Sequence, residues 1–165
     1  MARRRRWEFR PPIERVQGGF RINPDDPERE VLSRLLAEMR TLLMGPSDNP
    51  ALVRMFPTAY HQPAHAQLDV EYQRLMREEL VASRLAGITT VLGVLSSQQV
   101  VTEQELAALM QGLNGLRLIL GTALDVGEEH DLDDIAADDP HVGEHHLYVF
   151  LSWLLEWTVR AMQGT

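Results

Sequence analysis

The 165-residue chain contains no cysteine and no lysine, so all sixteen of its basic residues are arginines. Without cysteine it has no disulfide, thiolate metal site, cysteine nucleophile or thiol redox switch. Without lysine it has no Schiff-base chemistry and no P-loop lysine. A serine-nucleophile motif and a glycine-rich phosphate loop are also missing from the sequence. We therefore expect a protein that is not an enzyme and binds no cofactor.

Long apolar runs are absent as well. No run reaches the roughly 18 residues that a membrane span needs, because Arg117 and Arg160 interrupt the two best candidates. The arginine-rich N-terminus has no apolar stretch behind it, unlike a secretory signal. A hydrophobic content of 44% and a charged content of 24% are typical of globular proteins. These features predict one cytoplasmic domain without membrane contact.

The charges are segregated along the chain. Residues 1–21 contain seven arginines against Glu8 and Glu14, whereas residues 125–144 contain nine carboxylates and no arginine. We expect a basic N-terminal arm over residues 1–10, a single helical domain over 11–165, and an acidic loop at 125–144. Such an arrangement indicates an interaction surface, or self-association between copies of the chain.

The hydrophobic pattern predicts a short β ribbon followed by helices. Apolar and polar residues alternate over 7–10 and 20–22, with a turn signal at Gly18-Gly19. Apolar residues then recur with a helical period over 26–44, 51–56, 64–95, 103–124 and 145–162. The third of these segments is either continuous or broken near Arg77. Its predicted core stripe includes Leu68, Tyr72, Leu75, Met76, Leu80, Ile88, Val91, Leu92 and Leu95. The fold class is therefore mainly α: a single-domain bundle of about five helices with a small N-terminal β ribbon.

Arg117 interrupts an otherwise apolar helix, three residues after Asn114. A buried charge needs a partner, because an uncompensated one costs several kcal/mol. One interpretation is an ion pair with a carboxylate, and another is contact with an anion or a nucleic-acid phosphate. The candidate carboxylates for the ion pair are those of Glu78, Glu79 and Glu156.

Nine residues are candidates for contact with nucleic acid or a partner. In the arm they are Arg3, Arg4, Arg5, Arg6, Trp7 and Arg10, and on the third helix they are Arg74, Arg77 and Arg84. Arginines neutralise phosphates and a tryptophan can stack on a base, but such an arm can equally be a solvated tail. A helix-turn-helix is disfavoured, because the helix after residue 102 begins with Glu103 and Glu105, where phosphates would approach.

Histidines four residues apart raise the question of a metal site. His61 with His65 and His141 with His145 have this spacing, and two such residues on one helix can share a metal ion. Proline or glycine lies within or beside each pair, so a solvated polar loop is the better interpretation. We expect no metal site, and a metal-dependent enzyme using His141, His145 and His146 is the third functional hypothesis.

The order of several segments resembles an actinobacterial family formerly described as a domain of unknown function and named AosR-like after an oxidative-stress transcriptional regulator. The most specific similarity is at 113–124, where Asn114, Arg117 and Gly121 belong to the signature. The supporting segments are 49–60, 72–75, 78–80, Arg84, 91–92, 151–153 (which includes Trp153) and 159–161.

The resemblance implies a regulator that binds DNA and works with an alternative sigma factor. It also implies a switch made by an N-terminal cysteine pair, which this chain lacks, since it has Arg3 to Trp7 there. The leading hypothesis is therefore a non-enzymatic regulator that binds DNA or the transcription machinery without a thiol switch. The alternative is a protein-interaction adaptor without nucleic-acid contact. A homodimer is expected, with Trp153 and Trp157 as candidate interface residues, although Trp153 is more consistent with the core.

Overall fold

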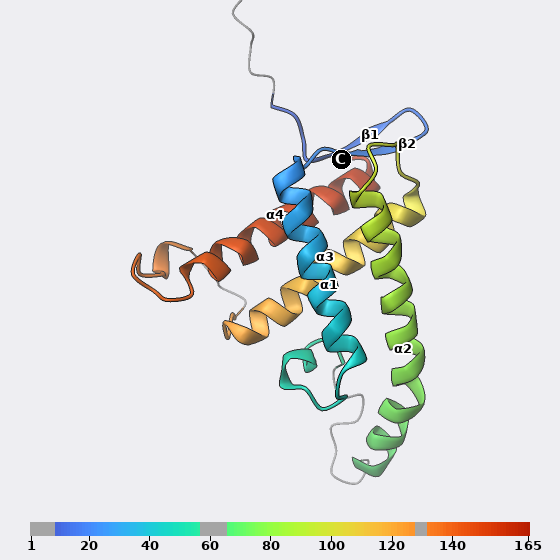
Figure 1. The fold of residues 1–165 in the computed structure, drawn as a ribbon, viewed down its shortest axis with the longest axis vertical. Helices are drawn as coiled ribbons and strands as arrows, with labels where there is room; N and C mark the ends of the chain where they lie inside the picture. The colour runs from blue at the N-terminus through green and yellow to red at the C-terminus, as the bar shows by residue number, and fades with distance from the viewer. Residues whose placement is uncertain (1–8, 57–65, 128–131) are drawn as a thin grey trace, which may run out of the picture.

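The computed structural model describes residues 9–56, 66–127 and 132–165. Within these ranges an antiparallel ribbon precedes four α-helices (Figure 1). The ribbon consists of β1 (Ile13–Val16) and β2 (Gly19–Ile22), and the helices are α1 (Asp26–Met44), α2 (Ala66–Leu95), α3 (Glu103–Ala123) and α4 (Val142–Gln163). Two short 3-10 turns are η1 (Pro50–Leu52) and η3 (Leu132–Asp134). The prediction of a mainly α fold with a small N-terminal ribbon is confirmed, with η1 in place of the predicted helix 51–56.

The ribbon begins later than the alternation of residues predicted. The strand expected at residues 7–10 is wrong for Phe9 and Arg10, which precede β1, while residues 7 and 8 lie outside the described ranges. Pro11 and Pro12 have no backbone N–H to donate to a ladder, so pairing starts at Ile13, opposite Ile22.

Gly19 allows the ribbon to approach the start of α3. Its φ is 152°, and a Cβ atom placed there would lie 2.3 Å from the carbonyl oxygen of Val101. Beside it, the amide of Phe20 donates to Val101 at 2.9 Å and the amide of Val101 donates back to Phe20 at 2.8 Å. A side chain at position 19 would separate these two backbones, so the predicted glycine turn also serves a tertiary contact.

Side chains cap the first turns of α1 and α3, and the other helices pack around α3. The side chain of Asp25 accepts the amide of Glu28 at 3.0 Å, and Thr102 accepts that of Glu105 at 3.1 Å. Helix α3 contacts α1, α2 and α4, as well as η1 and β2. The largest fully buried side chains include Leu32, Leu36, Leu52, Ile88, Val91, Leu106, Leu109, Leu113, Leu151 and Leu154. The core therefore lies between α3 and its neighbours.

Helix α2 is continuous, so the predicted alternative of a break near Arg77 is wrong. Its buried apolar residues begin at Ile88, whereas Leu75 is 70% exposed. Leu68, Tyr72 and Leu80 are exposed too, so the prediction that they belong to the core is also wrong. Figure 1 shows the reason: residues 66–81, which we call the projecting half of α2, extend past the ends of α1 and α3.

Arg29 on α1 is a buried cation, 6% exposed. Its guanidinium donates to the carbonyl oxygens of Pro24 at 2.8 Å, of Leu95 and Ser97 at 3.0 Å each, and of Ile22. Leu95 is the last residue of α2, where helix carbonyls lack intrahelical partners and the helix dipole is negative. Arg29 therefore joins β2, α1 and the C-terminal end of α2.

We expect Arg29→Met to lower the free energy of unfolding by about 3 kcal/mol, because it leaves buried carbonyl groups without donors. Arg29→Lys should cost less, since an ammonium group still donates to some of these oxygens. Urea denaturation followed by circular dichroism measures both values. A loss below about 0.5 kcal/mol for Arg29→Met would show that the guanidinium does not hold this junction.

Candidate functional site

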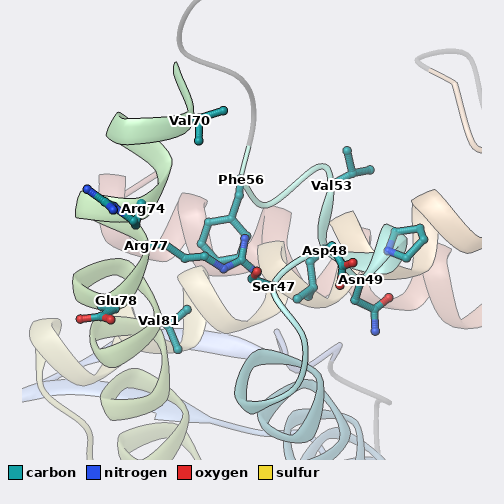
Figure 2. Close-up of a pocket in the computed structure, with 12 residues that line it drawn as sticks. Ser47, Asp48, Asn49, Val53, Phe56, Val70, Arg74, Arg77, Glu78 and Val81 are labelled. Atoms are coloured by element: carbon teal, nitrogen blue, oxygen red, sulfur yellow. The ribbon is translucent and has the colours of Figure 1, made fainter. Parts of the chain in front are cut away.

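An open groove of about 920 Å³ lies between the projecting half of α2 and the segment that follows α1 (Figure 2). We call it the α2 groove. Its lining on the side of the segment is Ser47, Asp48, Asn49, Pro50, Leu52, Val53 and Phe56, and on the side of the helix it is Val70, Arg74, Arg77, Glu78 and Val81. Six of these twelve residues are apolar and come from both sides, and the other six are polar or charged.

Local sequence signals account for the conformation of residues 47–56, which form one wall of the groove. Gly45 ends α1, with its amide donating to Leu42 at 3.2 Å. Asn49 then starts η1 by accepting the amide of Ala51 at 3.0 Å through its side chain. Leu52 is buried, and η1 packs on α3. Because η1 is held on α3 in this way, Phe56 faces α2.

The opposite wall follows from helical periodicity. Val70, Arg74, Arg77 and Val81 are spaced by four, three and four residues, so they lie on one face of α2. Farther along, the same face continues into the core at Ile88. The groove is therefore the extension of a core-facing stripe beyond the point where the bundle covers it.

Arg77 lies across the middle of the groove (Figure 2). Its Cζ atom is 4.4 Å from the centroid of the Phe56 ring, a cation–π contact. The side chain is half-buried, and no oxygen of the described residues accepts a hydrogen bond from it. Arg74 and Glu78 lie on the α2 rim and point away from Phe56 in the same view.

Each wall of the groove carries an exposed apolar residue. Val53 on one wall is 60% exposed and Val70 on the other is 67% exposed. Leu68 and Leu75 are exposed too, but helical periodicity places them on the opposite face of the same half-helix. Exposed apolar residues rimmed by polar ones are typical of interaction surfaces.

The residues predicted to contact nucleic acid or a partner do not lie together in the structure. Arg3 to Arg6 and Trp7 lie outside the described residues. Arg10 contacts Glu14 at 3.4 Å. Burial acts to raise the pKa of Glu14, but hydrogen bonds from Asn23 and Arg10 outweigh it and the pKa is lowered. Arg74 and Arg77 line the α2 groove, whereas Arg84 lines a separate small cavity beside Met39 and Met55.

Arg117 has neutral partners, so its predicted ion pair is wrong. Its Nε donates to the hydroxyl of Ser152 at 2.8 Å, and a terminal nitrogen donates to that of Tyr148 at 3.3 Å. Of the three carboxylates named above, that of Glu156 pairs instead with Arg160. The guanidinium also lies 5.3 Å from the centroid of the Tyr148 ring. Arg117 thus joins α3 to α4.

The other residues of the 113–124 signature lie on the same helix. Gly121 is closely packed there, because a Cβ atom would come within 3.1 Å of Arg54 and 3.3 Å of Tyr148. Asn114 is half-buried on α3. The resemblance over this segment therefore falls on residues with structural roles rather than on the groove.

Trp153 is 40% exposed, so the expectation that it belongs to the core is wrong. Its ring lies 6.2 Å from that of Phe150, centroid to centroid. Trp157 is half-buried, with its ring 5.7 Å from that of Phe9. These aromatic side chains are a second exposed surface, and a homodimer formed through them remains a prediction.

The histidines of the described chain lie at the start of α4. His141 precedes α4, with its Nδ1 4.0 Å from Glu144, and His145 and His146 lie in the first turns of the helix. Within residues 9–56, 66–127 and 132–165 no three His, Asp or Glu residues form a group that could hold a metal ion. His61 and His65 lie outside those ranges. In the same ranges, no helix has the length and apolar character needed to cross a membrane.

Sequence reasoning missed the apolar residues of the groove, Val53, Phe56, Val70 and Val81. One signal was present: apolar residues occur on more than one side of the helix over 68–81. A helix that packs on one side needs apolar residues on that side only. Apolar residues on further sides could have indicated a half-helix that makes a second apolar contact.

Comparison with known proteins places the chain in one family of unassigned function. The family model described as "Domain of unknown function (DUF2017)" matches residues 5–162. No curated protein and no solved structure gives a significant match. The family match carries no link to AosR-like or oxidative-stress regulators.

Substitutions on α2 test whether its projecting half lies outside the core. We expect Leu75→Ser to change the free energy of unfolding by less than about 0.5 kcal/mol, because the side chain is exposed. Ile88→Ser, on the buried half, should cost about 3 kcal/mol or more, since it leaves a cavity and buries a hydroxyl. Urea denaturation of both variants gives the comparison. Similar losses for the two would contradict the described arrangement.

Proposed function

The chain belongs to the DUF2017 family, and we propose that it is a non-enzymatic regulatory protein that acts by holding a segment of a partner protein in the α2 groove. The observation that carries this proposal is the groove itself, which is open along an exposed half-helix, measures about 920 Å³ and has apolar side chains on both walls. Binding sites of this kind receive an amphipathic helix or an extended peptide by covering its apolar side chains.

The exposed apolar residues support a protein partner over a small molecule. Val53 and Val70 lie on the two walls of the groove and stay in water in the isolated chain. A small ligand confined to the groove would leave them largely exposed, whereas a protein segment can cover both walls. Burying such residues contributes about 25 cal/mol per Å² of apolar area.

The regulatory part of the proposal combines two of the hypotheses drawn from the sequence. The AosR-like resemblance implied contact with a sigma factor or other transcription machinery, and the adaptor hypothesis implied a protein partner alone. Both need a protein-binding surface, which the groove supplies. The proposal uses no catalytic residues. Only the AosR-like resemblance connects the chain with oxidative stress.

DNA binding is the second candidate function, supported by the resemblance and the arginine-rich arm. An acidic protein that binds DNA must concentrate its arginines on one face. Arg74 and Arg77 lie at the groove beside exposed apolar residues, while Arg84 and Arg10 lie elsewhere. This distribution favours a protein partner over a duplex.

Site-specific photo-crosslinking in cells tests the leading proposal. Benzoylphenylalanine introduced at Val53 or at Val70, on opposite walls, should give the same discrete protein adduct, identified by mass spectrometry. Introduced at Thr90, an exposed position on the other half of α2, it should not give this adduct. Adding Phe56→Glu to either groove probe should abolish the adduct, because the charge replaces the apolar base of the groove.

Different adducts from the two walls, or an adduct that persists with Phe56→Glu, would contradict a shared occupant of the groove. Melting temperatures of the purified variants serve as the control for folding. Phe56→Leu is the matched variant that keeps an apolar side chain at this position, and it should retain the adduct.

Fluorescence anisotropy with duplex DNA tests the second candidate. We expect equal binding to the duplex upstream of the protein's own gene and to a scrambled duplex, lost when residues 1–10 are deleted. The reason is that an arginine arm contacts phosphates without reading bases. A preference for the native duplex that survives the deletion would instead establish a DNA-binding regulator.

A further inference from the structure

Arg77 differs from most other arginines of the described chain in what its guanidinium contacts. The buried or half-buried Arg29, Arg40 and Arg117 all donate to carbonyl or hydroxyl oxygens. Arg77 is half-buried too, but its guanidinium has only the face of Phe56 as a partner. Arg84 likewise lacks an oxygen acceptor in the described chain, and it lies outside the groove.

We propose that Arg77 binds the carboxylate of an Asp or Glu side chain in the partner segment. This inference rests on the proposed function, since it specifies the chemistry of the groove's occupant. A planar guanidinium stacked on a ring keeps its N–H groups at the edge, where a carboxylate accepts two of them side by side. Stacking on Phe56 also restricts the side chain before the partner arrives, which reduces the entropy lost on binding.

The position of Arg77 along α2 sets the pattern of the occupant. It lies between Val70, about two turns before it, and Val81, about one turn after it. The acidic residue of the partner therefore has apolar residues on both sides of it. This central position favours a side-chain carboxylate within a segment over the carboxylate at a chain terminus.

The remaining charges of the groove restrict the occupant further. Arg74 and Glu78 lie on the α2 rim, where their charges offset each other, and Asp48 lies on the opposite wall. Asp48 repels additional negative charges there, so a segment with one acid at Arg77 fits better than a run of acids. It also disfavours a nucleic-acid backbone, whose phosphates repeat at every nucleotide.

Selection from a phage library of random 12-residue peptides tests the inference. Peptides enriched on the wild-type protein should combine apolar residues with an Asp or Glu between them. Peptides enriched on Arg77→Gln should keep the apolar residues and lose the acid. Arg84→Gln is the matched control, because it removes a second half-buried arginine of the same helix outside the groove, and it should select the wild-type pattern.

A double-mutant cycle with one enriched peptide measures the contact itself. Exchanging its acid for the corresponding amide should weaken binding to the wild type by about tenfold or more, the range for a hydrogen bond to a charged group. The same exchange should change binding to Arg77→Gln by less than about twofold. Equal losses in the two proteins, or the same acidic preference in both selections, would overturn the inference.

Three further results separate this inference from the function on which it rests. Apolar peptides without an acidic preference, bound by the wild type and lost with Val53→Glu and Val70→Glu, would overturn the role of Arg77 and leave groove binding intact. No enriched peptide, or peptides that bind Val53→Glu and Val70→Glu unchanged, would overturn both. Displacement of the peptide by duplex DNA would assign the guanidinium to phosphate and overturn the carboxylate inference.

Discussion

The guanidinium of Arg29 determines where α2 stands relative to the rest of the bundle. It connects β2, the start of α1 and the last carbonyl of α2 through buried hydrogen bonds. A buried cation without a carboxylate is tolerated there because carbonyl oxygens and the negative end of a helix dipole replace its hydration. The exposed Arg15 also binds carbonyl oxygens at a helix end, donating to Ala161 at 3.1 Å and to Met162 at 3.0 Å at the end of α4.

Because α2 is held at its C-terminal end, its N-terminal half projects beyond the bundle. Apolar residues of the helix pack against the core from Val81 onward, whereas α1 ends before it reaches the first turns of α2. Leu68, Val70 and Leu75 in the projecting half stay in water, and residues 47–56 supply the facing wall. The same anchoring that stabilises the bundle thus leaves a groove that a partner segment can cover, at the cost of exposed apolar surface in the isolated chain.

A chain without lysine uses arginine in several distinct environments. Arg29 binds backbone carbonyls, Arg117 binds the hydroxyls of Ser152 and Tyr148, and Arg77 stacks on a ring. Each depends on the planar, multi-donor geometry of a guanidinium, which an ammonium group does not provide. These contacts explain how arginines can lie inside or between elements of the described chain.

The sequence alone determined which segments are helical, because helical period and capping are local properties. Asp25 and Thr102 cap the first turns of α1 and α3 through their side chains, and Gly45 ends α1. Local pattern could not determine burial: Leu75 and Ile88 look equivalent in sequence, but only Ile88 meets α3 and its neighbours. For the same reason Trp153 looked like a core residue and Arg117 like half of an ion pair. Only the tertiary structure placed Phe56 against Arg77 and formed the groove, because that contact depends on where α1 and α3 end in space.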